Sequence, residues 1–281
     1  MKIALVTDSS CDIPYEMVIS HQIHVVPNIL IIDGKSIEDN WEFSRQKFYE
    51  QLPKMTSMPT TSTASVGTYQ ALYEDLLQKG SDQVVSIHCS SQFSGIFNAA
   101  RTAAQSFSGK VQVVDSQQVT LGLGFQVLEA AEALTDGISL ESLLVMLQQT
   151  RERIRVIAML DTLEYIRRSG RISWARASLG AMLNLKPFLE VKGGSVHSLG
   201  EARTRKKGMA RLFEMMQSPE PLKRFALLHS NAEDDARRLL ENLAPEVPTP
   251  PHIVNVNTVL GAHVGPNGLG FVALFQEKSL T

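Results

Sequence analysis

The 281-residue sequence predicts an α/β fold in two parts: an N-terminal part with a mainly parallel sheet and flanking helices, and a C-terminal α+β part. Two observations predict this class. In the first half, short apolar segments alternate with helical patterns, as in sheets that helices cover on both faces. After about residue 152 this alternation gives way to a hairpin signal, a separate helix and a last strand. We therefore expect domains at residues 1–152 and 153–281.

Five segments carry the pattern of β-strands. Each is a short apolar run between polar or turn-forming residues. In chain order they are Lys2–Thr7, Ile23–Ile32, Gln83–His88, Val111–Asp115 and Arg155–Leu160.

Helix signals lie between most of these strands. Pro14 suits the first turn of a helix over Tyr15–His21, and a helical pattern over Ile96–Arg101 follows the third strand. Ser139 is expected to cap a further helix, because the residues around it have the spacing of a hydrophobic staple. Ser65 is a fair N-cap for a helix whose apolar residues recur at helical spacing, at Val66, Tyr69, Leu72, Tyr73, Leu76 and Leu77.

The second half carries its own signals. Gly193-Gly194 lies between two strand-like runs, which predicts a β-hairpin. Asn231 is expected to cap a helix that has an acidic first turn and arginines further along, an order that suits the helix dipole. Phe271–Phe275 is expected to form a final strand after the turn Gly265-Pro266-Asn267-Gly268. These signals together predict the α+β part.

Composition limits the possible partners and the setting. The net charge of −2 gives no overall electrostatic reason to expect nucleic acid. No apolar run approaches the length that spans a membrane, and the N-terminal run is too short for a secretory signal. The only cysteines, Cys11 and Cys89, are expected to be free thiols in a reducing cytoplasm.

Hydroxyl side chains gather where the predicted strands end. Thr7-Asp8-Ser9-Ser10, Ser90-Ser91 and Asp115-Ser116 each follow a strand, and Ser94-Gly95 continues the second group toward a helix. Ligands of parallel sheets bind beyond the carboxyl ends of the strands. The residues alone leave four uses open for these serines: a nucleophile, a phosphate cradle, helix caps, or hydrogen-bond donors to another anion.

Several kinds of site are absent from the sequence. There is no Gly-x-Ser-x-Gly elbow for a hydrolase nucleophile and no glycine-rich phosphate loop with its lysine. Gly122-Leu123-Gly124 lacks the third glycine of a dinucleotide fingerprint, and no metal ligands have zinc spacing. A second hydroxyl run, Pro59–Gly67, also enters a helix, so two runs could converge on one anion. Helix capping remains the structural alternative for both.

An ordered set of motifs resembles the DegV family of bacterial fatty-acid-binding proteins over essentially the whole chain. It begins with the strand-end groups and the two hydroxyl runs above. It continues through 163–172 (LEYIRRSGRI), Leu185-Lys186-Pro187, Ala202-Arg203-Thr204 and Gly261-Ala262-His263-Val264-Gly265-Pro266. This sequence departs from the family's usual residues at Thr63-Ala64, Ile96 and Asn267, and the changes at 63 and 96 could alter pocket shape and acyl preference.

The resemblance implies a function. Family members bind one long-chain fatty acid, such as palmitate, between the two domains, and act as the binding subunit of a fatty acid kinase. A separate ATP-dependent kinase then phosphorylates the carboxylate, so no cofactor or metal is expected in the carrier itself. By resemblance the carboxylate rests on Thr61 and Ser91, with Ser62 and Ser94 close by. Arg171, Arg203 and His263 match positions linked to phosphoryl transfer or kinase docking.

Elementary energetics agrees with a buried acyl chain. About 15 methylenes gain on the order of 12 kcal/mol by leaving water. A hydroxyl that donates to a carboxylate contributes roughly 1.5–3 kcal/mol without a full countercharge. Two other functions remain open: a stand-alone hydrolase or phosphotransferase with Ser91 as nucleophile, and a lipid sensor without a kinase. The basic residues have their own alternative, a solvated surface.

Overall fold

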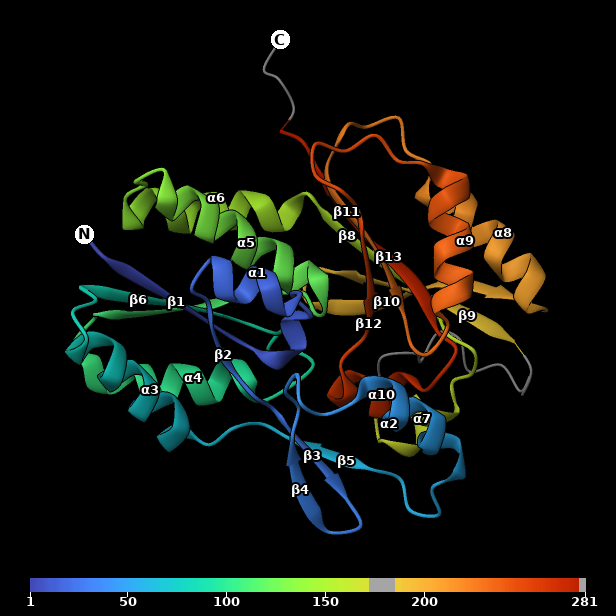
Figure 1. Ribbon diagram of the computed structural model, residues 1–281, viewed down its shortest axis with the longest axis horizontal. Coiled ribbons are helices and arrows are strands. Elements are labelled where there is room, and N and C mark those ends of the chain that lie inside the picture. Colours follow the sequence, from blue (N-terminus) through green and yellow to red (C-terminus); the bar gives the residue numbers. More distant parts are fainter. Residues whose placement is uncertain (172–184, 278–281) are drawn as a thin grey trace.

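The computed structural model describes residues 1–171 and 185–277, and it confirms the predicted fold class (Figure 1). A parallel sheet in the first half has the strand order β2-β1-β6-β7. Its strands are β1 (Ile3–Asp8), β2 (His24–Val26), β6 (Gln83–His88) and β7 (Val111–Asp115).

Five helices cover this sheet, α3 and α4 on one face and α1, α5 and α6 on the other (Figure 1). Ser65 and Ser139 cap α3 and α6 as predicted, because each side chain accepts a hydrogen bond from the backbone three residues later. Their bounds are α1 (Tyr15–Ser20), α3 (Val66–Gln78), α4 (Ile96–Ala104), α5 (Leu121–Thr135) and α6 (Leu140–Glu152).

The predicted strand Ile23–Ile32 is wrong as one element. The strand is interrupted at Pro27 and Asn28, and the residues after them do not belong to the parallel sheet. These residues join a small antiparallel sheet of order β4-β3-β5, beside the helix α2 (Arg45–Gln51). The strands are β3 (Ile29–Ile32), β4 (Lys35–Glu38) and β5 (Thr60–Ser62). The Thr61 run is therefore an edge strand before it reaches α3.

The second half builds a six-stranded mixed sheet of order β10-β9-β8-β13-β11-β12. The hairpin at Gly193-Gly194 is confirmed, since β9 and β10 pair antiparallel across it. The strands are β8 (Ile154–Met159), β9 (Lys186–Lys192), β10 (Ser195–Ala202), β11 (Leu222–His229), β12 (His252–Asn255) and β13 (Leu269–Phe275). The helices are α7 (Glu164–Arg168), α8 (Arg205–Met216), α9 (Glu233–Leu243) and α10 (Thr258–Val264).

Asn231 does not cap α9, contrary to the sequence prediction. Its backbone is left-handed, with φ of 58°, and the N-cap position belongs to Ala232, which makes no side-chain capping bond. Ser230, just before it, instead forms backbone hydrogen bonds with Asn267 and Gly268 in the turn before β13. The chain therefore turns once more before the acidic first turn of α9 begins.

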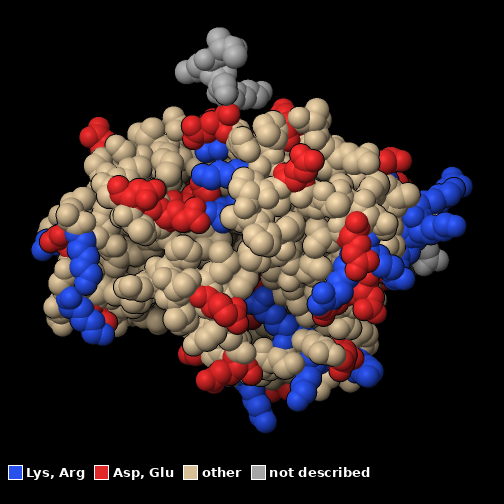
Figure 2. Space-filling view, turned by 45° about the horizontal axis from the view of Figure 1, so that its top comes forward, with Lys and Arg blue, Asp and Glu red and all other residues tan. Residues whose placement is uncertain are grey.

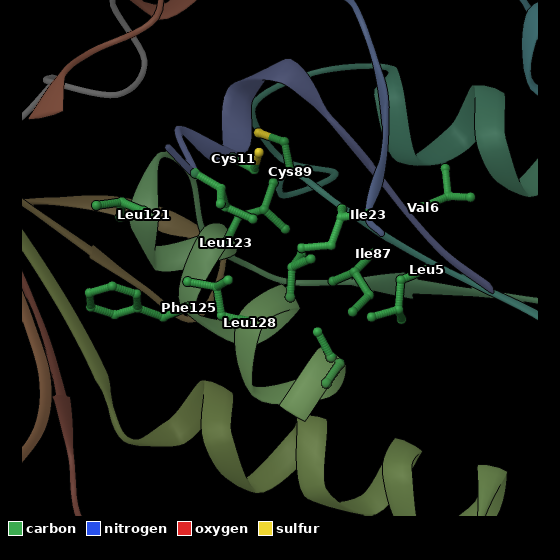
Figure 3. Close-up of a cluster of buried hydrophobic side chains, with 14 of the residues drawn as sticks. Leu5, Val6, Cys11, Ile23, Ile87, Cys89, Leu121, Leu123, Phe125 and Leu128 are labelled. Atoms are coloured by element: carbon green, nitrogen blue, oxygen red, sulfur yellow. The ribbon is translucent and has the colours of Figure 1, made fainter. Parts of the chain in front are cut away.

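The two faces of the mixed sheet have different neighbours. Phe188, Phe225 and Phe271 belong to a core with residues of α8 and α9. Val156, Leu228 and other residues of the opposite face belong to the same buried cluster as α5 and the parallel sheet, part of which is drawn in Figure 3. The parallel sheet thus precedes residue 152 and the mixed sheet follows it, while one buried cluster includes residues of both sheets.

The helix α5 lies at the centre of this shared core, and every residue from Leu121 to Ala131 is buried. Its glycines allow close packing. A Cβ on Gly124 would lie 2.5 Å from the carbonyl oxygen of Cys11, and one on Gly122 would lie 2.7 Å from Cγ2 of Val156. These contacts explain Gly122-Leu123-Gly124 as a packing motif between the two sheets.

Ion pairs also connect the halves. Glu129 of α5, only 4 % exposed, binds Nε of Arg224 at 2.8 Å, and Lys223 lies beside it. On the face shown in Figure 2, acidic and basic side chains are largely intermixed. No helix in the described ranges has the length and apolar character needed to cross a bilayer.

Candidate functional site

An apolar cavity of about 90 Å³ lies between the inner face of the mixed sheet and the N-terminal half. Close-packed protein interiors rarely leave voids larger than one water molecule, so this volume suggests a ligand site. Its walls come from β8, β9, β10, β11 and β13, from α7 and α10, and from two N-terminal segments that include Phe93 and Thr120.

The period of the strands makes the cavity apolar. Val156 and Ala158 of β8, and Leu189 and Val191 of β9, lie two residues apart and therefore point to the same face. Leu260 and Val264 are four residues apart on α10, so they present one helix face to the same space. An acyl chain would meet hydrocarbon on each of these sides.

Next to the cavity, the structure brings together two residues that the family resemblance had assigned to different roles. Oγ1 of Thr61 lies 3.0 Å from Nε2 of His263. Thr61 comes from the edge strand β5, and His263 precedes the cavity residue Val264. The head-group position predicted at Thr61 therefore adjoins one end of the wall that α10 provides.

His263 is an uncharged group at neutral pH. Burial and, to a smaller extent, the positive charge of Arg171 together lower its pKa to about 4. Arg171 is held by its backbone N–H, which donates to the carbonyl of Ile166, and by Nη1, which donates to the carbonyl of Ser169. The structure thus places the cationic Arg171 close enough to the neutral His263 to lower the pKa of its imidazole.

The hydroxyl run with Ser90, Ser91 and Ser94 forms the loop between β6 and α4. The Ser91 N–H donates to Oδ2 of Asp115 at 3.3 Å, and Phe93 reaches the cavity. Ser90 is buried and donates to the carbonyl of Gly194 at 2.8 Å, so the hairpin of the second half closes over this loop. Ser94 accepts from the N–H of Ile96, but the N-cap position of α4 belongs to Gly95, so Ser94 is not the cap that the sequence left open.

The two hydroxyl runs are neighbours in space. A Cβ built on Gly95 would lie 3.8 Å from Cγ2 of Thr63, in ordinary contact distance. Ser62, one residue earlier, is exposed, and its hydroxyl donates to the carbonyl of Thr63. The two runs therefore lie side by side, with Ser62 on the outer side, and their convergence on one anion stays a prediction.

Arg203 lies apart from this group. It is exposed in the bend between β10 and α8, and no hydrogen bond found among the described residues joins it to Arg171 or His263. The structure therefore does not join Arg203 to the Thr61 and His263 pair, and its link to phosphoryl transfer or kinase docking stays a prediction.

Two buried carboxylates, Asp12 and Asp39, hold α10 in place, a role that was not predicted from the sequence. Asp12 accepts hydrogen bonds from Thr120 Oγ1 at 2.6 Å and from the backbone N–H and side chain of Asn257, and it pairs with Arg45 at 2.8 Å. Asp39 accepts from the N–H and hydroxyl of Thr258. An acid directly after a buried strand, as in Asp8-Ser9-Ser10-Cys11-Asp12, was the only available signal.

An arrangement of Asp, His and Ser also occurs, but not at Ser91. Nδ1 of His88 lies 2.9 Å from Asp8, and Nε2 of His88 lies 2.6 Å from Oγ of Ser86. All three side chains are fully buried, and Tyr73 donates to the same serine oxygen at 2.8 Å. A nucleophile needs access to substrate, so this chain of hydrogen bonds is structural. In the described ranges, no group of acid, histidine or cysteine side chains is arranged to hold a metal ion.

The fold and the site define an α/β protein with an apolar cavity between its two halves and neutral hydroxyls beside it. The chain belongs to the DegV family, since the model of this family, whose members are described as uncharacterised, matches residues 2–276. Protein DegV of Bacillus subtilis is 35% identical over 287 residues, which cover 98% of this chain and 100% of that protein.

Solved structures of similar proteins superpose on nearly the whole of this chain. A DegV family protein from Thermus thermophilus, described by its fatty acid binding, superposes with a TM-score of 0.90 at 34% identity, over 98% of this chain and 100% of that one. DegV from Bacillus subtilis, described as a fatty acid binding protein, gives a TM-score of 0.87 at 35% identity over 98% and 100% of the two chains.

Proposed function

We propose that this protein binds one long-chain fatty acid in the cavity between its halves and presents the carboxylate to a separate ATP-dependent kinase in the cytoplasm. The observation that carries the proposal is an apolar cavity with Thr61, His263 and the Ser91 loop beside it. The fatty acid binding of the two similar solved proteins supports the same ligand class.

In this proposal Thr61 and Ser91 donate to the carboxylate and leave it nucleophilic, because a neutral hydroxyl does not neutralise its charge. Arg171 and His263, beside Thr61, would then face the incoming phosphoryl group, since Arg suits phosphate oxygens. Arg203, which is exposed, would contact the kinase. The protein itself would be a carrier that supplies part of an active site.

The first expected result concerns the ligand. Purified protein should carry one long-chain fatty acid, because an acyl chain of about 15 methylenes gains on the order of 12 kcal/mol on burial. Native mass spectrometry should show a single acyl-sized mass increment that disappears on denaturation, and the released acid can be identified. An extract without acyl chains, together with no binding or thermal stabilisation by added fatty acids, would rule out the carrier.

The second expected result separates binding from phosphoryl transfer. Arg171→Ala, Arg203→Ala and His263→Ala should keep the acyl chain but reduce kinase-dependent acyl-phosphate formation. Loss of one charged hydrogen bond of about 1.5–3 kcal/mol corresponds to a roughly 10- to 100-fold lower rate. Lys should replace either Arg poorly, because it lacks the planar fork.

Lys206→Ala is the matched control for Arg203, since Lys206 is also exposed and lies three residues away in the first turn of α8. It should behave as the unmodified protein. Loss of lipid in all three site variants would show that these residues bind the lipid. Full activity in all three would show that they are only part of a solvated surface.

Two measurements distinguish the alternatives. Turnover without a partner, or covalent labelling of Ser91, would favour a stand-alone enzyme. Lipid binding without acyl-phosphate formation in the presence of any bacterial fatty acid kinase would favour a sensor.

A further inference from the structure

The carboxylate of Asp8 is the most heavily hydrogen-bonded acid of the N-terminal half. Its Oδ1 accepts from the backbone N–H and hydroxyl of Ser10 and from Nδ2 of Asn28. Its Oδ2 accepts from the Cys89 N–H at 3.2 Å and lies 2.9 Å from Nδ1 of His88. The side chain is completely buried at the end of β1, where it cannot contact a ligand directly.

One group of these bonds leads to Thr61. Asn28 Nδ2 donates to Asp8 at 3.1 Å, and the Asn28 N–H donates to Ser9 Oγ at 3.1 Å. Asn28 directly precedes β3, and in the register of the small sheet Leu30 of β3 pairs with Thr61 of β5. The position of the Thr61 strand is therefore tied to Asp8 through a single strand.

The other group leads to Ser91. Cys89 and His88 both bind Oδ2 of Asp8, and Ser91 is two residues beyond Cys89 in the same loop. Nε2 of His88 lies 2.6 Å from Oγ of Ser86, and the Tyr73 hydroxyl donates to the same oxygen at 2.8 Å. The start of the Ser91 loop therefore cannot shift without breaking bonds to a buried charge.

The charge of Asp8 is maintained in this environment. Burial by itself raises the pKa of the carboxyl, but the hydrogen bond and charge of His88, with the bonds from Ser10 and Cys89, lower it below its usual value. An ionised carboxylate that accepts several hydrogen bonds makes each of them stronger than a neutral acceptor would. A neutral residue of the same shape would hold both segments less firmly.

We propose that Asp8 is a positioning residue for the head-group site: its carboxylate fixes the strand that carries Thr61 and the loop that carries Ser91 relative to each other. This inference rests on the proposed function, because it assumes that these two hydroxyls bind the carboxylate of a fatty acid. It assigns to Asp8 an effect on the head group alone, since its hydrogen bonds involve none of the residues that line the acyl cavity.

The test compares two ligands of equal chain length, palmitate and hexadecanol, both delivered from cyclodextrin to delipidated full-length protein and measured by calorimetry. Asp8→Asn should bind palmitate roughly tenfold or more weakly, because a displaced hydroxyl loses a hydrogen bond to a charged group. Its affinity for hexadecanol should stay within about twofold, since the alcohol needs no precise anion site.

Two further variants make the result specific. Asn28→Ala removes only the tie to the Thr61 strand, so it should weaken palmitate alone and by less than Asp8→Asn. Thr135→Ala removes a partly buried hydrogen bond inside α5 that has no link to Asp8, and it should leave both affinities unchanged. If Asp8→Asn gives no cooperative thermal transition, the comparison of Asn28→Ala with Thr135→Ala decides.

Equal losses for palmitate and hexadecanol would overturn the inference, because they would show a general effect on the fold. Unchanged palmitate affinity in folded Asp8→Asn would overturn it as well. Failure of the proposed function would be visible separately, since the unmodified protein would then bind neither ligand. Binding of both ligands equally by the unmodified protein would remove the head-group site and the positioning role together.

Discussion

Replacing Asp12 by Ala is expected to lower the free energy of unfolding by about 3–5 kcal/mol, the range for removing one partner of a buried charged group. The substitution leaves the Thr120 hydroxyl and the N–H of Asn257 buried without their acceptor, and it leaves Arg45 with the carbonyl of Asn255. It also places Ala at a left-handed position, φ 55°. Urea denaturation followed by circular dichroism measures the change.

Asp12→Asn should lower the free energy of unfolding by less than Asp12→Ala. Burial raises the pKa of Asp12 although Arg45 opposes the shift, which indicates that the charge is incompletely compensated, and Asn keeps the shape and tolerates a positive φ. Asp75→Ala is the control, because Asp75 forms an exposed pair with Lys79 on α3 and should change stability by less than about 1 kcal/mol. If Asp12→Ala and Asp75→Ala lowered the free energy of unfolding equally, Asp12 would not be holding α10 in place.

Thr61→Ala combined with Ser91→Ala is expected to weaken fatty acid binding while the protein stays folded. Each hydroxyl contributes about 1.5–3 kcal/mol as a donor to a charged acceptor, so a single loss corresponds to roughly 10- to 100-fold in affinity. Because both would bind one carboxylate, the two losses should not simply add. Calorimetric titration of palmitate into delipidated protein measures the change.

The matched control replaces a threonine and a serine outside the site. Thr102 donates to a carbonyl within α4 and Ser20 donates to one within α1, and both are exposed. Thr102→Ala with Ser20→Ala should bind palmitate normally. Normal affinity in the folded Thr61 and Ser91 variant would remove these hydroxyls from the carboxylate site.

Most strands and capped helices could be predicted because their signals are local. Ser65 and Ser139 cap their helices through atoms three residues away, and the hairpin at Gly193-Gly194 depends on two adjacent glycines. The split of Ile23–Ile32 also had a local signal, because Pro27 has no backbone N–H for a ladder hydrogen bond. The small sheet that the second part joins was not predictable locally, since the hydrogen bonds from Asn28 to Ser9 are tertiary.

The candidate site was predictable as a set of residue types but not as a geometry. The hydroxyl runs stood out because they follow strands and precede helices. The contact between Thr61 and His263 joins residues 202 positions apart, and no local pattern encodes it. The roles of Asp8 and Asp12 were not predictable either, because a sequence does not distinguish a buried acid from an exposed one.

The place of β13 in the mixed sheet has a consequence for how the protein is made. This strand lies between β8 and β11, so until it is present the sheet exists only as two separate pieces. Translation adds about 5–20 residues per second, so β13 is synthesised on the order of 10 s after β8. The nascent chain meanwhile exposes the apolar strand faces that later line the cavity. A stalled or shortened product is thus expected to be a substrate for chaperones and proteases, because the cavity cannot form before β13 has been added.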